Sequence, residues 1–141
     1  MNNAINIAYR MLYYTYGIIP IIAGFDKYCD FLVDWDIYLN ESIPLCLGIT
    51  QDTFMYTAGA IEILAGLLVF IRPQIGGYVV SAWLILISIN IISMGSHHHE
   101  GCVHSVTHYD VAVRDIAMAV GAYVLVLLAK ALQERDKKIS R

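Results

Sequence analysis

Four long apolar stretches divide this sequence and limit what it can fold into. They cover residues 5–25, 54–71, 78–94 and 111–132, and the third contains no charged residue. A helix needs about 20 residues to cross the hydrocarbon core of a bilayer, and no stretch shows the alternation of a half-buried strand. With 58% hydrophobic and 15% charged residues, a chain of 141 residues cannot bury this apolar surface as a soluble globule. The sequence therefore predicts an all-α fold, a single transmembrane domain over residues 1–141 built as an integral membrane four-helix bundle.

The basic residues indicate how the spans are oriented. Lys27 stands alone at one end of the spans, and Arg114 lies at the boundary of the last span. The other basic residues lie near the N-terminus, in the turn expected at residues 72–77 or in the C-terminal tail: Arg10, Arg72, Lys130, Arg135, Lys137, Lys138 and Arg141. Because loops rich in lysine and arginine stay in the cytoplasm, both termini are expected there. No small-residue cleavage site follows the first span, so a signal peptide is not predicted.

The two longer loops are expected to face outward. The first, residues 26–53, holds six acidic residues and one lysine. Its apolar residues recur at helical spacing and predict an amphipathic helix on the membrane surface, more readily a structural lid than a partner-binding helix. This apolar stripe consists of Phe31, Leu32, Trp35, Tyr38 and Leu39. The three cysteines, Cys29, Cys46 and Cys102, all lie in outward loops, so either two of them form a disulfide or all are free thiols.

The second outward loop is rich in metal-ligating residue types. Imidazole and thiolate are ligands that zinc and copper prefer, and residues four apart share a helical face. The candidate ligands are His97, His98, His99, Cys102, His104 and His108. Zinc or copper binding here competes with a simpler interpretation, a polar loop that titrates near neutral pH. Met94–His99 also looks like the start of an expression tag, but it lies in the middle of the chain and has only three consecutive histidines, so it is taken as native sequence.

Charged residues inside the spans form a second candidate site. Glu62 lies near the middle of the second span, and Arg114 and Asp115 lie in the outer turns of the fourth. Because intramembrane charges are costly and usually face a partner or a cavity, we expect Arg114 to pair with Glu62, and Asp115 to meet Lys27 or a loop histidine. A salt bridge that locks the bundle is the favoured interpretation. The alternative is a polar centre that holds a quinone headgroup, a proton or a small solute.

Small and hydroxyl-bearing residues predict close helix packing inside the bundle. In the third span Ser81 and Ser88, seven residues apart, share one face. The small residues of the second and fourth spans are Ala58, Gly59, Ala65, Gly66, Ala112, Ala119, Gly121 and Ala122.

Three segments resemble the DoxX-like family of small four-span bacterial membrane proteins. Residues 16–27 are similar to that family's first span, residues 60–68 to the glutamate and glycine pattern of its second, and residues 109–117 to the Arg-Asp pair that opens its fourth. The resemblance implies a four-helix bundle in a bacterial inner membrane, with family positions at Lys27, Glu62, Arg114 and Asp115. Members have been linked to quinone-coupled thiosulfate oxidation, to membrane redox complexes and to chaperoning of membrane proteins. The histidine-rich loop departs from the family pattern.

Three functional hypotheses follow. The first is a non-catalytic subunit or assembly partner of a membrane complex, working with another membrane protein or a second copy of itself. The second is a quinone-linked redox protein, and the third is an outward-facing zinc or copper binder. No nucleophile-base pair, phosphate-binding glycine loop or dinucleotide fingerprint occurs, so enzyme activity is not the favoured interpretation. The net charge of −3 offers no basic field for nucleic acid.

Overall fold

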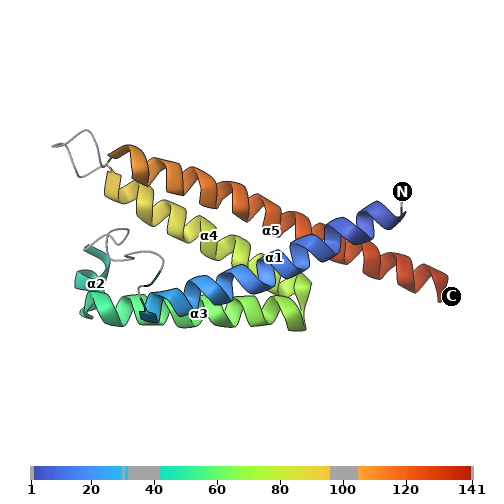
Figure 1. The fold of residues 1–141 in the computed structure, drawn as a ribbon, viewed down its shortest axis with the longest axis horizontal. Coiled ribbons are helices and arrows are strands. Elements are labelled where there is room, and N and C mark those ends of the chain that lie inside the picture. The colour runs from blue at the N-terminus through green and yellow to red at the C-terminus, as the bar shows by residue number, and fades with distance from the viewer. Residues whose placement is uncertain (1, 30, 32–41, 96–104, 141) are drawn as a thin grey trace.

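The computed structural model describes residues 2–29, 31, 42–95 and 105–140. Within these ranges the chain forms five helices and no strand (Figure 1). They are α1 (Asn2–Cys29), α2 (Ser42–Leu47), α3 (Gln51–Ile71), α4 (Pro73–Gly95) and α5 (Ser105–Ile139). The predicted all-α class is confirmed, and each of the four apolar stretches lies inside one long helix.

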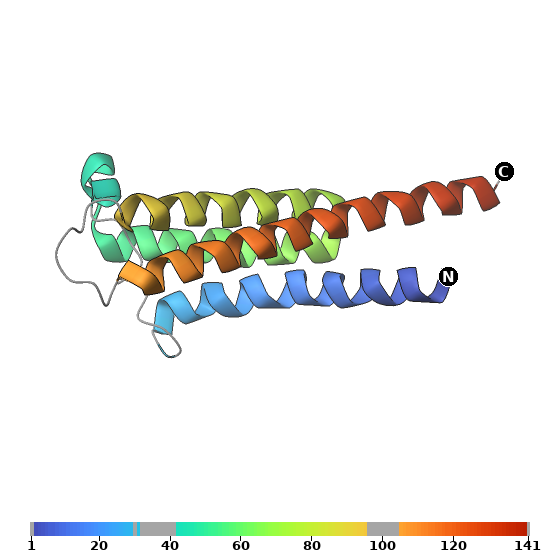
Figure 2. The ribbon, with the colours of Figure 1, turned by 90° about the horizontal axis from the view of Figure 1, so that it is seen from above.

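The long helices pack as two antiparallel pairs. α1 lies along α3 and α4 lies along α5, and the contact between α3 and α4 joins the pairs. Both termini lie at one end of the bundle, which we call the terminal end, and α2 lies at the other, the loop end (Figures 1 and 2). α1 and α5 run past the turn between α3 and α4 at the terminal end.

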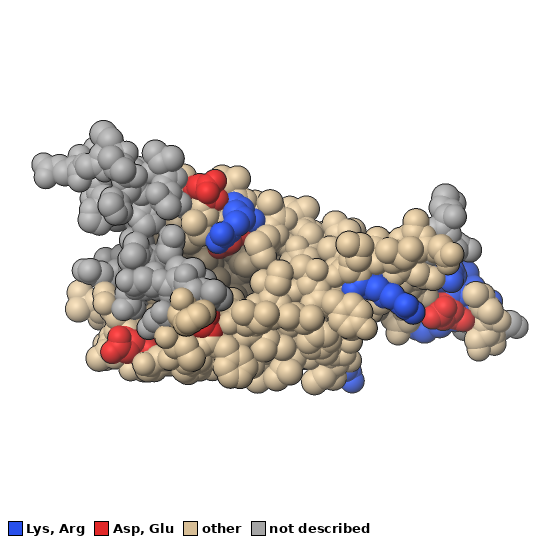
Figure 3. Space-filling view, viewed as in Figure 1, with Lys and Arg blue, Asp and Glu red and all other residues tan. Residues whose placement is uncertain are grey.

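Among the described residues, three helices are long and apolar enough to cross a membrane. These candidate spans are Gln51–Ile71, Pro73–Ser93 and Tyr109–Ile139. α1 is long enough but less apolar, because it contains Arg10 and several tyrosines. On the face drawn in Figure 3, the charged side chains lie in two groups, with a short uncharged stretch of surface between them. The chain therefore has the character of a membrane protein, and a fourth span formed by α1 stays a prediction.

The turn between α3 and α4 is shorter than the sequence suggested. We expected residues 72–77 to form it, but α4 already begins at Pro73 and only Arg72 separates the two helices. Proline is favoured in the first turn of a helix, where its missing N–H group loses no hydrogen bond. A Cβ at Gly76 would meet the backbone of Val69, so this glycine lets α4 start directly against the end of α3.

The predicted outer-loop helix lies almost entirely outside the residues that the structure describes. The stripe that begins at Phe31 falls almost entirely on residues 32–41, outside the described part of the chain. The helix found in this loop is α2, six residues long and further along the sequence. The predicted amphipathic helix therefore stays a prediction.

Close packing between α1 and α3 depends on two pairs of glycines. A Cβ at Gly59 would lie 2.8 Å from the carbonyl oxygen of Gly24, and one at Gly66 would lie 2.7 Å from that of Gly17. Each helix therefore carries two glycines seven residues apart, which face the glycines of the other helix. Such small residues let two helix backbones approach closely inside a membrane.

The packing between α4 and α5 uses the predicted small and hydroxyl side chains. Ser81 Oγ donates a hydrogen bond to the Ala119 carbonyl oxygen at 2.9 Å, and Ser88 Oγ lies 3.3 Å from that of Ala112. Both serines therefore lie on one face of α4, as their spacing predicted, and this face meets α5. Ala112, Ala119 and Ala122 are all buried.

Tyr16 links α1 to α5 through a hydrogen bond. Its hydroxyl donates to the Met118 carbonyl oxygen at 2.7 Å, and the side chain is buried. We expect Tyr16→Phe to lower the free energy of unfolding by about 1 kcal/mol, the usual net value of one such bond. Thermal unfolding in detergent, followed by circular dichroism, measures this loss. The matched control is Tyr14→Phe, because Tyr14 is 56% exposed, and equal melting of the two variants would contradict the prediction.

Candidate functional site

Lys27, close to the loop end of α1, and Glu62, near the middle of α3, form a buried ion pair. The Lys27 Nζ lies 2.8 Å from the Glu62 Oε2, and the two side chains are only 6% and 7% exposed. The glycine contact between α1 and α3 determines this pairing, because a Cβ at Gly59 would lie 3.2 Å from the Lys27 Cβ. The lysine stem therefore lies against α3, within reach of the carboxylate one turn further along.

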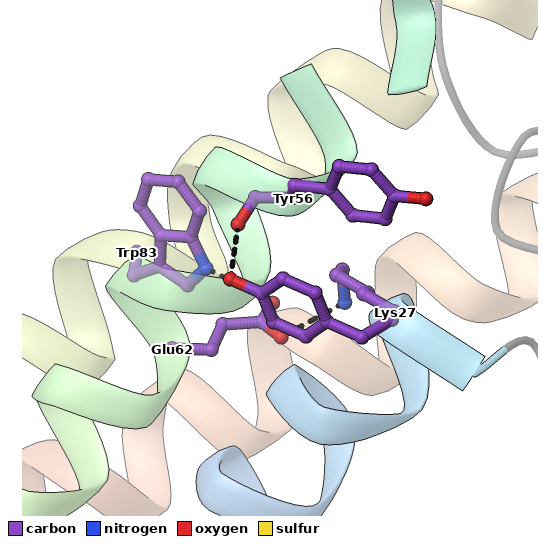
Figure 4. Close-up of polar contacts among 5 residues, drawn as sticks. Lys27, Tyr56, Glu62 and Trp83 are labelled. Atoms are coloured by element: carbon purple, nitrogen blue, oxygen red, sulfur yellow. Dashed lines mark hydrogen bonds and ion pairs between the residues drawn. The ribbon is translucent and has the colours of Figure 1, made fainter. Parts of the chain in front are cut away.

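Trp83 is the second hydrogen-bond partner of the Glu62 carboxylate. Its indole Nε1 donates a hydrogen bond to Glu62 Oε1 at 3.1 Å. In Figure 4 the Lys27 and Trp83 side chains approach Glu62 from two sides, one from α1 and the other from α4. Each carboxylate oxygen thus has one partner, and the three residues connect α1, α3 and α4. We call Lys27, Glu62 and Trp83 the polar centre.

Two tyrosines lie beside the polar centre. The Tyr28 hydroxyl donates to the Tyr56 carbonyl oxygen at 2.7 Å. The two rings are parallel, with centroids 5.3 Å apart. Both side chains are partly exposed, which suits aromatic rings at the boundary of a membrane. They add a second connection between α1 and α3 next to the ion pair.

Arg114 is not the partner of Glu62, so this part of the sequence prediction was wrong. Its side chain is 65% exposed, and its Nε lies 3.6 Å from Asp115 Oδ1. The buried face of α5 passes through Ala112, Asp115 and Ala119. Arg114 lies about 100° around the helix from Asp115, so it points away from this buried face.

Asp115 is buried in the same region as the polar centre. Its residue exposure is 7%, and it is close enough to Lys27 and Glu62 for both charges to act on it. The structure therefore brings together all four residues of the predicted intramembrane site, with Arg114 at its surface. Asp26, next to Lys27, is also buried and was not assigned by sequence.

Trp83 is the other residue that the sequence analysis missed. It lies inside the most apolar stretch, away from the ends of the span, where tryptophans are usually found. A buried indole N–H needs a hydrogen-bond acceptor, so a tryptophan in that position points to a polar group on a neighbouring helix. That signal could have predicted a partner such as Glu62.

The predicted metal and disulfide sites lie mostly outside the described residues. This holds for His97, His98, His99, Cys102 and His104, and the structure gives only the backbone of His108. Within the part of the chain that the structure describes, no group of three metal-ligating side chains occurs. Cys29 and Cys46 are exposed free thiols. Zinc or copper binding therefore stays a prediction.

Comparisons with protein-family models, with curated proteins and with solved structures find no match to this chain. The geometry of the polar centre therefore carries the functional argument.

Proposed function

We propose that this chain is a non-catalytic integral membrane protein that serves as a subunit or assembly partner of a membrane complex. The observation that carries the proposal is that the Glu62 carboxylate of the polar centre already has its hydrogen-bond partners within this chain. Both oxygens of Glu62 are engaged by side chains of the same chain, Lys27 and Trp83, at 2.8 and 3.1 Å. A catalytic acid or base needs access to the proton that it transfers, whereas these contacts join helices.

The DoxX-like resemblance supports the same proposal. The residues that carry it include Lys27 and Glu62, which pair in the structure, and Asp115, which is buried beside them. In this proposal the shared positions maintain the bundle, and the outer helix surfaces contact lipid and a partner. A quinone bound at the polar centre and a metal bound by the histidine-rich loop are the competing functions.

The partner proposal is tested by purifying the protein in a mild detergent and measuring the intact mass of what is recovered. We expect a defined complex with a second membrane protein or a second copy of this chain. A stoichiometric quinone or metal on a monomer would contradict the proposal and favour a competing function. Lys27→Met combined with Glu62→Gln is the informative variant, because it removes both charges of the ion pair. A quinone held by these charges would no longer bind, whereas a partner bound on the outer surface would remain.

The proposed topology has four spans, with α1 as the first and both termini in the cytoplasm of a bacterium. It predicts that Cys46, at the loop end, reacts with a membrane-impermeant maleimide in intact cells when Cys29 and Cys102 are replaced by serine. A cysteine placed at Ser140, at the terminal end, should react only after the membrane is permeabilised. The positive-inside rule and the even number of passes give this result.

The labelling experiment also distinguishes a topology with four membrane spans from one with three. If α1 does not cross the membrane, a cysteine at Ala4 and one at Ser140 should be labelled from opposite sides. The proposal requires both to be protected in intact cells. If Ser140→Cys is labelled in intact cells and Cys46 is protected, the orientation is the reverse of the proposed one, and the proposal is contradicted.

A further inference from the structure

α1 and α5 touch near the middle of α1 and separate towards the loop end. A Cβ at Gly121 would meet the Tyr16 hydroxyl, so the face of α5 that contains Gly121 contacts α1 there. Arg114 lies seven residues earlier, about 20° from Gly121 around the helix, yet its side chain is 65% exposed. The two helices have therefore separated at the level of Arg114, and Figure 1 shows them diverging in this direction. We call the space between them at this level the α1–α5 crevice.

Asp115 lies at the inner side of the α1–α5 crevice. Its side chain is only 10% exposed, and the charges of Lys27 and Glu62, which already pair with each other, act on it. Its ion-pair partner among the described residues is the Arg114 Nε, whose distance of 3.6 Å is too long for a hydrogen bond. A carboxylate that is buried without hydrogen-bond donors is costly. A ligand with N–H groups would remove this cost.

The crevice offers a positive and a negative group at the same depth in the membrane. Arg114 lies five residues inside the candidate span Tyr109–Ile139, about 7.5 Å along the helix, and a long arginine side chain can extend from there to the headgroups. Its guanidinium matches phosphate oxygens through paired N–H groups. Asp115, on the inner side, suits a cation that carries N–H donors. A phospholipid headgroup with a phosphate and a primary ammonium contains both partners.

We propose that the α1–α5 crevice binds the headgroup of phosphatidylethanolamine. Arg114 contacts its phosphate, and the Asp115 carboxylate accepts a hydrogen bond from its ammonium. Phosphatidylcholine has the same phosphate but no N–H group, and phosphatidylglycerol has no ammonium at all, so both leave Asp115 without a donor. The inference does not depend on the proposed protein partner, because it concerns a lipid bound to the isolated chain.

The test is a lipid titration of the delipidated protein in detergent, followed by native mass spectrometry. The probes have the same acyl chains and differ in the ammonium: phosphatidylethanolamine, its N-methyl and N,N-dimethyl forms, and phosphatidylcholine. We expect one phosphatidylethanolamine to bind about tenfold more tightly than phosphatidylcholine, the effect of one hydrogen bond to a charged group. The dimethyl form keeps one N–H and should also bind more tightly than phosphatidylcholine. Equal binding of these lipids, or tighter binding of phosphatidylglycerol, would overturn the site.

Asp115→Asn should lose most of the preference for phosphatidylethanolamine over phosphatidylcholine, whereas Arg114→Gln should weaken the binding of both lipids. The matched control is Asp110→Asn, which alters an exposed acidic side chain on the same helix and should keep the preference. Equal effects of Asp110→Asn and Asp115→Asn would show a diffuse attraction and contradict the proposal. The methylation series uses the unaltered protein, so it decides the proposal even if Asp115→Asn does not fold. Displacement of the lipid by an equal concentration of free phosphoethanolamine would mean that the ligand is a soluble compound, and would also overturn the lipid site.

Discussion

Replacing Lys27 by methionine should lower the free energy of unfolding by about 3–5 kcal/mol, the usual result of removing one partner from a buried ion pair. The lysine is 6% exposed and lies 2.8 Å from Glu62, so its loss leaves a buried carboxylate without a counter-charge. Methionine keeps the length of the apolar stem, which limits the loss of packing. Thermal melting in detergent and the amount of protein in the membrane both measure this effect.

Arg114→Met is the matched control for Lys27→Met. It also removes one positive charge, which lies beside Asp115, but from a side chain that is 65% exposed. We expect it to change stability by less than about 1 kcal/mol, because solvent screens the exposed Arg114 charge and its 3.6 Å contact with the buried Asp115 is long. A large loss of stability in Arg114→Met with none in Lys27→Met would mean that Arg114 is the partner of Glu62, as expected from sequence, and would contradict the structure.

A double variant distinguishes the stability lost with the ion pair from the stability lost with the packing of the two side chains. Glu62→Ala alone should lower stability, because Lys27 and Trp83 both lose their partner. In Lys27→Met combined with Glu62→Gln, neither position of the ion pair carries a charge, and glutamine still offers an oxygen to the Trp83 N–H. Much of the stability lost in Lys27→Met should therefore return. If the stability lost in the double variant equals the sum of the losses in the two single variants, Lys27 and Glu62 are not energetically coupled.

The helices could be predicted from sequence because bilayer length and apolar composition act on long segments. Glu62 could be identified as a buried partner because a lone carboxylate in an apolar span needs one. The partner itself could not be identified, because the choice between Lys27 and Arg114 depends on how α1 and α5 are rotated about their axes. A rotation of about 100° separates Arg114 from Asp115, and only the packed structure determines which of them is buried.

Local chemistry explains the other differences. Lys27 stands at the end of an apolar stretch and was placed in a loop, but α1 continues to Cys29 and buries it against Gly59. Pro73 was taken as part of a turn, although proline also suits the first position of a helix. The metal-ligand and outer-helix predictions fall largely on residues outside the described ranges, so they stay predictions.

Gly59→Leu should destabilise the protein by about 3 kcal/mol, at the upper end of the usual cost of overpacking. Even a Cβ at this position would lie 2.8 Å from the Gly24 carbonyl oxygen, which is backbone and cannot rotate away, so α1 and α3 must separate. The better helix propensity of leucine recovers only about 0.8 kcal/mol. Melting in detergent measures the effect, with Ala8→Leu, at an exposed position of α1, as the control.

The same substitution should also disrupt the polar centre, because Lys27 lies directly against Gly59. A Cβ there would lie 3.2 Å from the Lys27 Cβ, so a leucine must push the lysine away from Glu62. Gly59→Leu combined with Lys27→Met should therefore cost less than the sum of the two single losses, since both remove the same ion pair. Strict additivity would show that the glycine contact and the ion pair are independent. Gly59→Leu melting like Ala8→Leu would mean that α1 and α3 do not touch at this position.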